Sequence, residues 1–172
     1  DLTAGLPDSP AALSALQQLE TVAWVGCASL AGALPGGPWL GRLRRLALPC
    51  RVLADAASLE TLSGAQQLEQ LGVTDCYRWR AAATKAVTPW KTPSRYLKPE
   101  LQLILGWAAQ QASLQQLVLE APALKPMAPA VKKAQKAAPG LQIRQSRDVV
   151  HAVCGYARDS HYLLYAMAAE GV

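Results

Sequence analysis

The sequence predicts an α/β solenoid, in which parallel strands line a concave face, helices cover the convex face and a C-terminal helix caps the end. Three observations predict this fold. A phrase of alternating apolar residues returns about every two dozen positions, a turn follows the phrase, and the longer intervening segments carry apolar residues at helical spacing. With 172 residues and 51% hydrophobic side chains, the chain has the length of one domain and enough apolar surface for a continuous core.

The clearest copy of the phrase runs from Leu68 to Cys76 as apolar-x-x-apolar-x-apolar-x-x-Cys. Such a phrase places an alternating triplet on a strand and closes it with a small buried polar side chain, which is the pattern of a leucine-rich repeat. Copies begin at positions 19, 43, 68, 114 and 138, at intervals of 24, 25, 46 and 24 residues. Because such a repeat is about 20 to 29 residues long, the double interval predicts a degenerate unit between Tyr77 and Lys98.

The expected elements follow from the repeat phrase, from helical spacing and from breaker residues. Glycine and proline predict loops, Pro99 is allowed in the first turn of a helix, and Asp148 is an expected N-cap. In chain order we expect an opening loop to residue 12, a strand at 21–25, a loop at 30–38, a strand at 45–49, a helix at 54–67, a strand at 70–74, a helix at 99–111, a strand at 116–120, a helix at 125–138, a strand at 141–144 and a closing helix.

The whole chain, residues 1–172, is predicted to be a single domain with repeats over 13–146 and a capping helix over 148–170. An irregular insertion at 77–98 interrupts the repeats. It holds six basic residues, no acidic residue and four large aromatic side chains. Burial of a large apolar side chain contributes about 1.5 to 3 kcal/mol, so we expect either the core or a partner to cover these rings.

The strand alternation also predicts a binding surface. Residues between the inward leucines face the concave side, where Ala23, Ala47, Gly72 and Val118 form a smooth floor with polar margins. Such a floor would admit a helix or an extended segment of another protein; the alternative is a merely solvated face. For the insertion, the alternative to a partner-binding surface is that its aromatic rings fill the core. The candidate partner-binding residues are Arg45, Gln70, Thr74, Gln116, Glu120, Gln142 and Arg144 on the concave face and Trp79, Arg80, Trp90, Arg95 and Tyr96 in the insertion.

The cysteines are predicted to be structural. Cys27, Cys50 and Cys76 lie about one repeat apart at the turn after a strand, and such buried reduced thiols favour an intracellular setting. No Cys-x-x-Cys pair occurs, and His151 with Cys154 alone does not make a metal site. The sequence has no nucleophile elbow, phosphate-cradling loop or His-Glu-x-x-His motif, so we expect no enzyme, no catalytic residue, no metal and no cofactor.

Charge and hydropathy narrow the partner classes. The net charge of +5 suits an acidic protein surface, an anionic lipid face or a nucleic-acid backbone. The basic residues are not clustered as densely as in a nucleic-acid binder, so a protein partner is favoured over nucleic acid. Apolar stretches are far shorter than the roughly 18 to 20 residues of a membrane span, so no transmembrane segment is expected. Nothing in the sequence indicates a homo-oligomer.

The phrases at 19–27 and 68–76 resemble the cysteine-containing leucine-rich repeats of F-box-type adaptors and small mitochondrial proteins. The ending, Leu114 to Leu119 followed by a lysine-bearing helix and Pro139 to Ile143, is similar to ATP synthase coupling factor B and its relatives in respiratory-complex assembly. The resemblance does not explain the insertion or the closing helix. It implies a non-catalytic scaffold, a structural or accessory subunit of a larger complex, with a mitochondrial address favoured over a cytoplasmic one. The alternatives are an F-box-like substrate-recognition adaptor, although no F-box helix pair precedes residue 13, and an RNA-binding ribosomal accessory protein.

Overall fold

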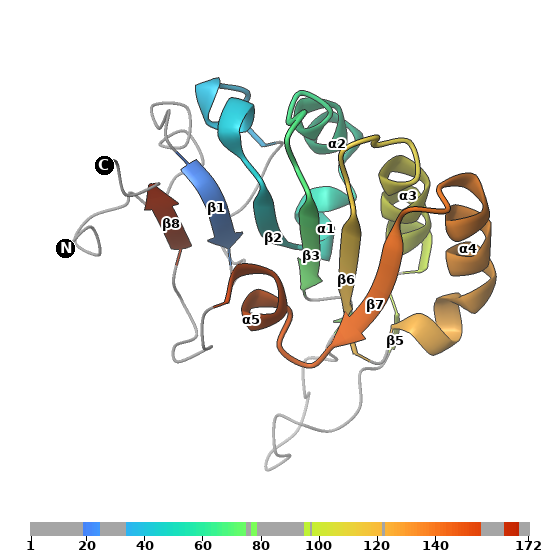
Figure 1. Cartoon of the computed structure of the whole chain (residues 1–172). Helices are drawn as coiled ribbons and strands as arrows, with labels where there is room; N and C mark the ends of the chain where they lie inside the picture. The colour runs from blue at the N-terminus through green and yellow to red at the C-terminus, as the bar shows by residue number, and fades with distance from the viewer. Residues whose placement is uncertain are drawn as a thin grey trace, which may run out of the picture.

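The computed structural model describes residues 19–24, 34–74, 77–78, 95–96, 98–121, 123–155 and 164–168 of the 172-residue chain. Strands and helices alternate through most of it (Figure 1). In chain order the elements are β1 (Leu19–Trp24), the 3-10 helix η2 (Pro38–Arg42), β2 (Arg45–Pro49), α1 (Cys50–Leu53), α2 (Ala56–Leu62), β3 (Gln70–Thr74), β4 (Tyr77–Arg78), β5 (Arg95–Tyr96), α3 (Lys98–Ala108), β6 (Gln116–Glu120), α4 (Leu124–Ala137), β7 (Gln142–Ser146), α5 (Val149–Cys154) and β8 (Leu164–Ala168).

Five strands form an open parallel sheet in the order β7-β6-β3-β2-β1, and β8 pairs with β1 in the antiparallel direction. The segments predicted to be parallel neighbours, 21–25, 45–49, 70–74 and 116–120, are confirmed as adjacent parallel strands over their described residues. The fold class is therefore α/β with a parallel sheet, as the repeat pattern predicted.

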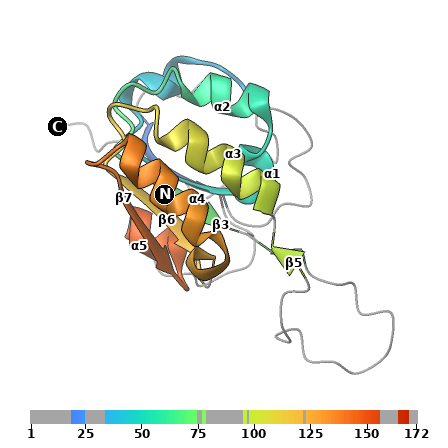
Figure 2. The ribbon, with the colours of Figure 1, turned by 90° about the vertical axis from the view of Figure 1, so that its right-hand side faces the viewer.

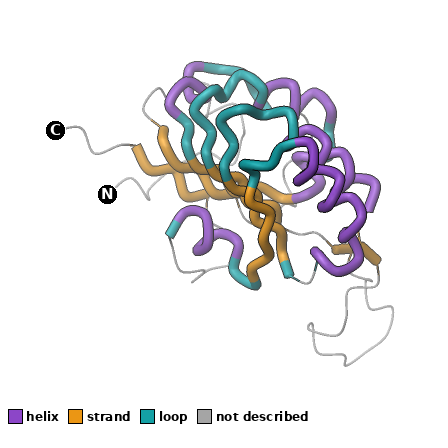
Figure 3. The backbone as a smooth tube through the Cα atoms, turned by 45° about the vertical axis from the view of Figure 1, so that its right-hand side comes forward, coloured by secondary structure: helices purple, strands orange, loops and turns teal. Residues whose placement is uncertain are grey.

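Side chains alternate between the two faces of the sheet, and each face has its own apolar cluster. Leu46, Leu71 and Leu117 face the helical layer, whereas Ala47 and Val118 face the opposite side. Figure 2 shows α1, α2, α3 and α4 on one side of the strands and α5 on the other. In Figure 3 the strands run as one layer between these helices and a single short helix.

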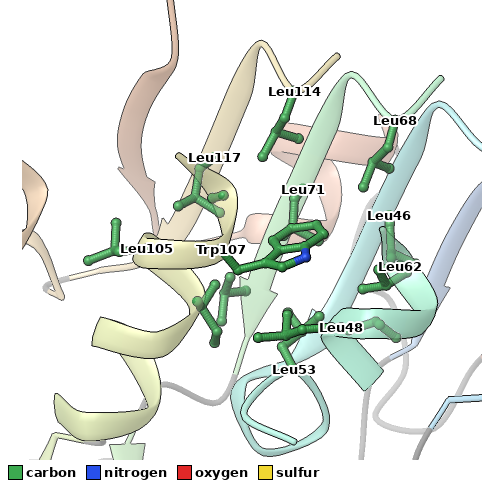
Figure 4. Packing of buried hydrophobic residues seen from close by; sticks show 14 of the residues in the cluster. Leu46, Leu48, Leu53, Leu62, Leu68, Leu71, Leu105, Trp107, Leu114 and Leu117 are labelled. Atoms are coloured by element: carbon green, nitrogen blue, oxygen red, sulfur yellow. The ribbon is translucent and has the colours of Figure 1, made fainter. Parts of the chain in front are cut away.

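The larger cluster fills the space between the sheet and the helical layer. Leu46, Leu71 and Leu117 are fully buried there, as the repeat phrase predicted for the inward leucines. Trp107 of α3 joins them (Figure 4). Its indole Nε1 donates a hydrogen bond to Ser63 Oγ at 3.0 Å. The indole thus keeps its polar atom paired while its ring adds to the core, which is the usual arrangement for a buried tryptophan.

Helices α2, α3 and α4 lie where helical spacing predicted them, although α2 and α3 end earlier than expected, and the short α1 was not predicted. The helix expected over 54–67 is α2, which ends at Leu62. Asp55 caps its start, because the carboxylate accepts a hydrogen bond from Ser58 N–H at 3.1 Å. Ser58 is itself buried, and its Oγ accepts from the Leu34 N–H at 3.0 Å, which fixes the loop before η2 against α2.

The predicted capping helix over 148–170 is wrong in length and in place. Helix α5 begins after Asp148 as expected but ends at Cys154, where Gly155 adopts a left-handed φ of 79°. A glycine in this conformation terminates a helix, because other residues adopt it at a steric cost. Residues 164–168 form β8 instead, which supplies hydrogen-bond partners to the edge of β1.

Candidate functional site

The predicted concave floor exists, but α5 covers it. The register aligns Ala23, Ala47, Gly72 and Val118 in one row across four neighbouring strands. Ala23, Ala47 and Val118 are fully buried in a cluster whose other members come from α5. Those members are Val149, Val150, Val153 and Cys154.

Gly72 lets α5 approach the sheet closely. A Cβ built on Gly72 would lie 2.6 Å from Val149 Cγ1 and 3.0 Å from Val153 Cγ2, which is closer than carbon atoms normally pack. The small side chains that were expected to leave room for a partner therefore accommodate a helix of the same chain. The expectation of an open floor is corrected accordingly.

Several polar interactions position α5, and three of them lie at its start or link it to β7. The Asp148 carboxylate accepts a hydrogen bond from His151 N–H at 2.9 Å and caps the helix. Ser146 Oγ donates to the Asp148 carbonyl at 2.8 Å and fixes the turn from β7. Arg144 Nη2 donates to the Ala152 carbonyl at 3.0 Å, where a cation complements the negative end of the helix dipole. The helix is thus joined to β7 by a short, hydrogen-bonded connection.

Beside α5 a row of polar side chains stays accessible. We call it the polar row, and the register aligns its members across all five parallel strands. Arg45 on β2 and Gln142 on β7 are exposed, while the other members are half-buried. The polar row consists of Thr21, Arg45, Gln70, Gln116 and Gln142.

Two arginines lie in or beside the polar row. Arg144 lies next to the polar row and donates from Nη2 to Gln116 Oε1 at 3.0 Å. Arg44 pairs with Glu69 at 2.9 Å, whereas the next residue, Arg45, forms no ion pair within the described part of the chain. The Arg45 guanidinium is therefore available to an acceptor from another molecule.

Two predicted residues at the carboxyl ends of the strands differ from the polar row. Thr74 is only 3% exposed and aligns with the buried Pro49, so its prediction as a partner-binding residue is wrong. Its Oγ1 has no hydrogen-bond partner among the residues that the structure describes. Glu120 is half-buried at the end of β6. Alternation correctly places Thr74 on this face but does not reveal how deeply the face is covered at that point.

The insertion is described only at its base. Tyr77 pairs with Tyr96 and Arg78 with Arg95, so β4 and β5 form a small antiparallel sheet that the sequence did not predict. The predictions for the side chains of Arg95 and Tyr96 lie outside what is described. The same holds for Trp79, Arg80 and Trp90.

The buried thiols form no metal centre in the described residues. Cys50 and Cys154 are free and buried, whereas Cys27 and Cys76 lie outside the description. Burial raises the pKa of the Cys154 thiol to about 12, and the positive charge of Arg45 opposes this only in part. His151 is exposed while Cys154 is buried, so the two side chains do not converge. No group of three or more potential metal ligands occurs within the described ranges.

The sequence analysis missed the position of α5, although two features point to it. Val149, Val150 and Val153 give the helix an apolar side, and the small residues of the floor leave room for it.

Among the described helices, none has the length and apolar character that crossing a bilayer requires. A scan of protein-family models, a search of curated proteins and a search of solved structures each gave no match to this chain.

Proposed function

We propose that the chain is a non-catalytic leucine-rich repeat scaffold that binds a partner protein along the polar row. In this proposal it is a structural or accessory subunit of a larger intracellular assembly, and the strand-and-helix units form a solenoid. The observation that carries the proposal is the unbroken register of the five parallel strands, which aligns five polar side chains next to each other.

The dimensions of the polar row suit a short protein segment. Neighbouring strands lie about 4.8 Å apart, so a row across five strands is on the order of 19 Å long. An extended segment of roughly six residues covers that length at about 3.3 Å per residue. The amide side chains of Gln70, Gln116 and Gln142 each offer a donor and an acceptor, which suits recognition of a peptide backbone.

Two arginines, one in the row and one beside it, supply charge. Arg45 offers a planar guanidinium to a carboxylate or carbonyl of the partner, and arginine is enriched at the residues that dominate interface energetics. Arg144 is held by Gln116 and by the Ala152 carbonyl, so its position is fixed before a partner arrives. Preorganised contacts cost less conformational entropy on binding, which favours this face as the interface.

The absence of catalysis is part of the proposal, and the state of the buried Cys154 thiol is consistent with it. The raised pKa of Cys154 keeps its thiol protonated near neutral pH, and a protonated thiol is a poor nucleophile. The similarity of the segments Leu114 to Leu119 and Pro139 to Ile143 to the coupling factor B-like family supports a mitochondrial address over a cytoplasmic one. The partner is then a subunit of an assembly in that compartment.

Affinity purification at moderate salt tests the proposal. The intact chain is compared with a polar-row variant, Arg45→Glu with Gln142→Glu, and with a matched control, Arg51→Glu with Gln67→Glu, whose side chains are exposed away from the row. We expect the intact chain and the control to retain the same partner protein and the polar-row variant to lose it. Urea unfolding at the same midpoint confirms that all three are folded. Retention of the partner by the polar-row variant would overturn the proposal.

A further inference from the structure

The strand β7 ends the sheet and leaves one edge open. Residues Gln142 and Ser146 bond toward β6, since Gln142 N–H donates to the Gln115 carbonyl at 2.9 Å and Ser146 carbonyl accepts from Ala121 N–H at 2.8 Å. Alternate residues of a parallel strand direct their backbone groups to opposite sides, so those of Ile143 point away from β6. No strand pairs with this outer side among the described residues.

Several of the usual protections of a sheet edge are absent from β7 itself. Its five residues pair with β6 in a continuous register without a bulge, and the strand contains no proline. Its single charged side chain, Arg144, is directed onto the sheet face by its bonds to Gln116 and Ala152. The charge is therefore not placed to repel a strand that approaches the edge. A regular, unprotected edge is a template for pairing with another chain.

The surroundings of this edge are strongly basic. Residues 121–147, which form α4, β7 and their connections, contain six basic residues and no acidic residue. Met127, Val131 and Ala134 form the buried side of α4, and all four lysines of this helix are exposed. Figure 2 shows α4 and β7 together at this end of the sheet. The basic residues are Lys125, Lys132, Lys133, Lys136, Arg144 and Arg147.

We propose that β7 is a strand-addition site for an extended acidic segment of a partner protein. Backbone hydrogen bonds to the edge supply affinity in this mode of recognition, and side chains supply specificity. The exposed lysines of α4 and Arg147 attract carboxylates along the added strand. This site uses the backbone edge of β7, whereas the polar row uses side chains on the sheet face, and Gln142 belongs to both. The Ile143 variants leave the side chains of the polar row unchanged, so the two proposals are tested separately.

Charge and composition favour this occupant over two others. A second copy pairing through β7 in a two-fold arrangement would bring two equally basic α4–β7 ends together, and like charges repel. Single-stranded nucleic acid is held largely by aromatic rings that stack on bases, and residues 121–147 contain no aromatic side chain.

The key variant is Ile143→Pro, because proline removes the outward N–H without removing a bond to β6. Ile143→Ala is its matched control, since it removes the same side chain but keeps the N–H. The probe is a labelled synthetic peptide of alternating Glu and Val, compared with a Lys-Val peptide of the same length and with a single-stranded RNA oligonucleotide. We expect Ile143→Pro to weaken binding of the Glu-Val peptide about tenfold relative to Ile143→Ala, and a triple change of Lys132, Lys133 and Lys136 to Glu to weaken it further.

Amide exchange on the wild-type chain gives a readout that does not depend on the folding of any variant. We expect the Glu-Val peptide to slow hydrogen exchange of the Ile143 amide, and rising salt to weaken the binding. Equal binding of the Glu-Val peptide by Ile143→Pro and Ile143→Ala, or an unchanged Ile143 amide when the peptide is bound, would overturn the proposal. Tighter binding of the Lys-Val peptide or the RNA would also overturn it, and so would self-association that Ile143→Pro abolishes.

Discussion

Gly72 of β3 lies directly against Val149 of α5, with so little space that a methyl group on Gly72 would come within 2.6 Å of Val149 Cγ1. The nearest atoms to such a methyl group belong to α5 and to Ala47, all of them buried. The contact explains why the centre of the sheet carries small residues. It also means that α5 is part of the packed structure on this face.

Gly72→Ala is expected to destabilise the chain by about 1 to 3 kcal/mol, because the added methyl group overpacks a buried contact between sheet and helix. Urea unfolding measures the change. The matched control is Gly106→Ala in α3, where an added Cβ has no atom within 4 Å. There the exchange favours the helix by roughly 0.5 to 1 kcal/mol. Equal effects of the two substitutions would show that α5 does not press on β3.

Asp148→Ala is expected to lower the free energy of unfolding by about 1 kcal/mol, since it removes the cap that accepts the His151 N–H. Amide exchange in α5 should rise more than exchange in α3, because only α5 loses its cap. Asp148→Asn is the control, as asparagine caps a helix nearly as well as aspartate. If the asparagine and alanine variants were equally destabilised, charge rather than capping would account for the effect.

The repeat phrase predicted the sheet well because it depends on residues that are close together in the sequence. Period-two alternation in Leu46 and Leu48 or in Leu117 and Leu119 fixes which face a strand buries, and the repeat spacing predicts parallel neighbours. The faces of Arg45, Gln70, Gln116 and Gln142 followed from the same alternation. The parallel sheet and the face that carries the polar row could therefore be predicted from the sequence.

The structure of the C-terminal part, α5 and β8, could not be predicted from local sequence patterns in the same way. Leu164–Ala168 is a short apolar run, and periodicity alone does not distinguish a strand from a helix over such a length. Val149, Val150 and Val153 give α5 an apolar side, but the local sequence does not determine which surface this side covers. The burial of Thr74 follows from long-range packing too, so its prediction as a binding residue failed for the same reason.

The Cys154 thiol should make stability depend on pH in the alkaline range. Its pKa rises from 9.0 to about 12 on folding, so the folded state keeps a proton that the unfolded state releases. The stabilisation is complete below pH 9 and is lost as the pH rises from there toward 12. Urea unfolding of the wild type and Cys154→Ala measures it, because the difference between them isolates this group. A difference that does not change up to about pH 11 would contradict the expectation.

The same thiol should also react slowly with alkylating reagents. Reaction requires the thiolate, and burial both raises the pKa and blocks access. We expect the native chain near neutral pH to leave Cys154 unmodified, while the urea-unfolded chain is modified at every cysteine, as peptide mass spectrometry would show. Rapid native modification of Cys154 would mean that α5 detaches from the sheet on that timescale.

Arg144→Ala is expected to loosen α5 and the polar row together, because one guanidinium nitrogen bonds both Gln116 Oε1 and the Ala152 carbonyl at 3.0 Å. Each bond is exposed, so a loss of about 0.5 to 1.5 kcal/mol is expected in urea unfolding, with faster amide exchange in α5. Arg147→Ala is the matched control, since Arg147 is an exposed arginine that forms no hydrogen bond within the described part of the chain. Equal stability of the two variants would show that the bonds of Arg144 do not hold the helix, and α5 would then depend on its apolar packing, its cap and its remaining hydrogen bonds.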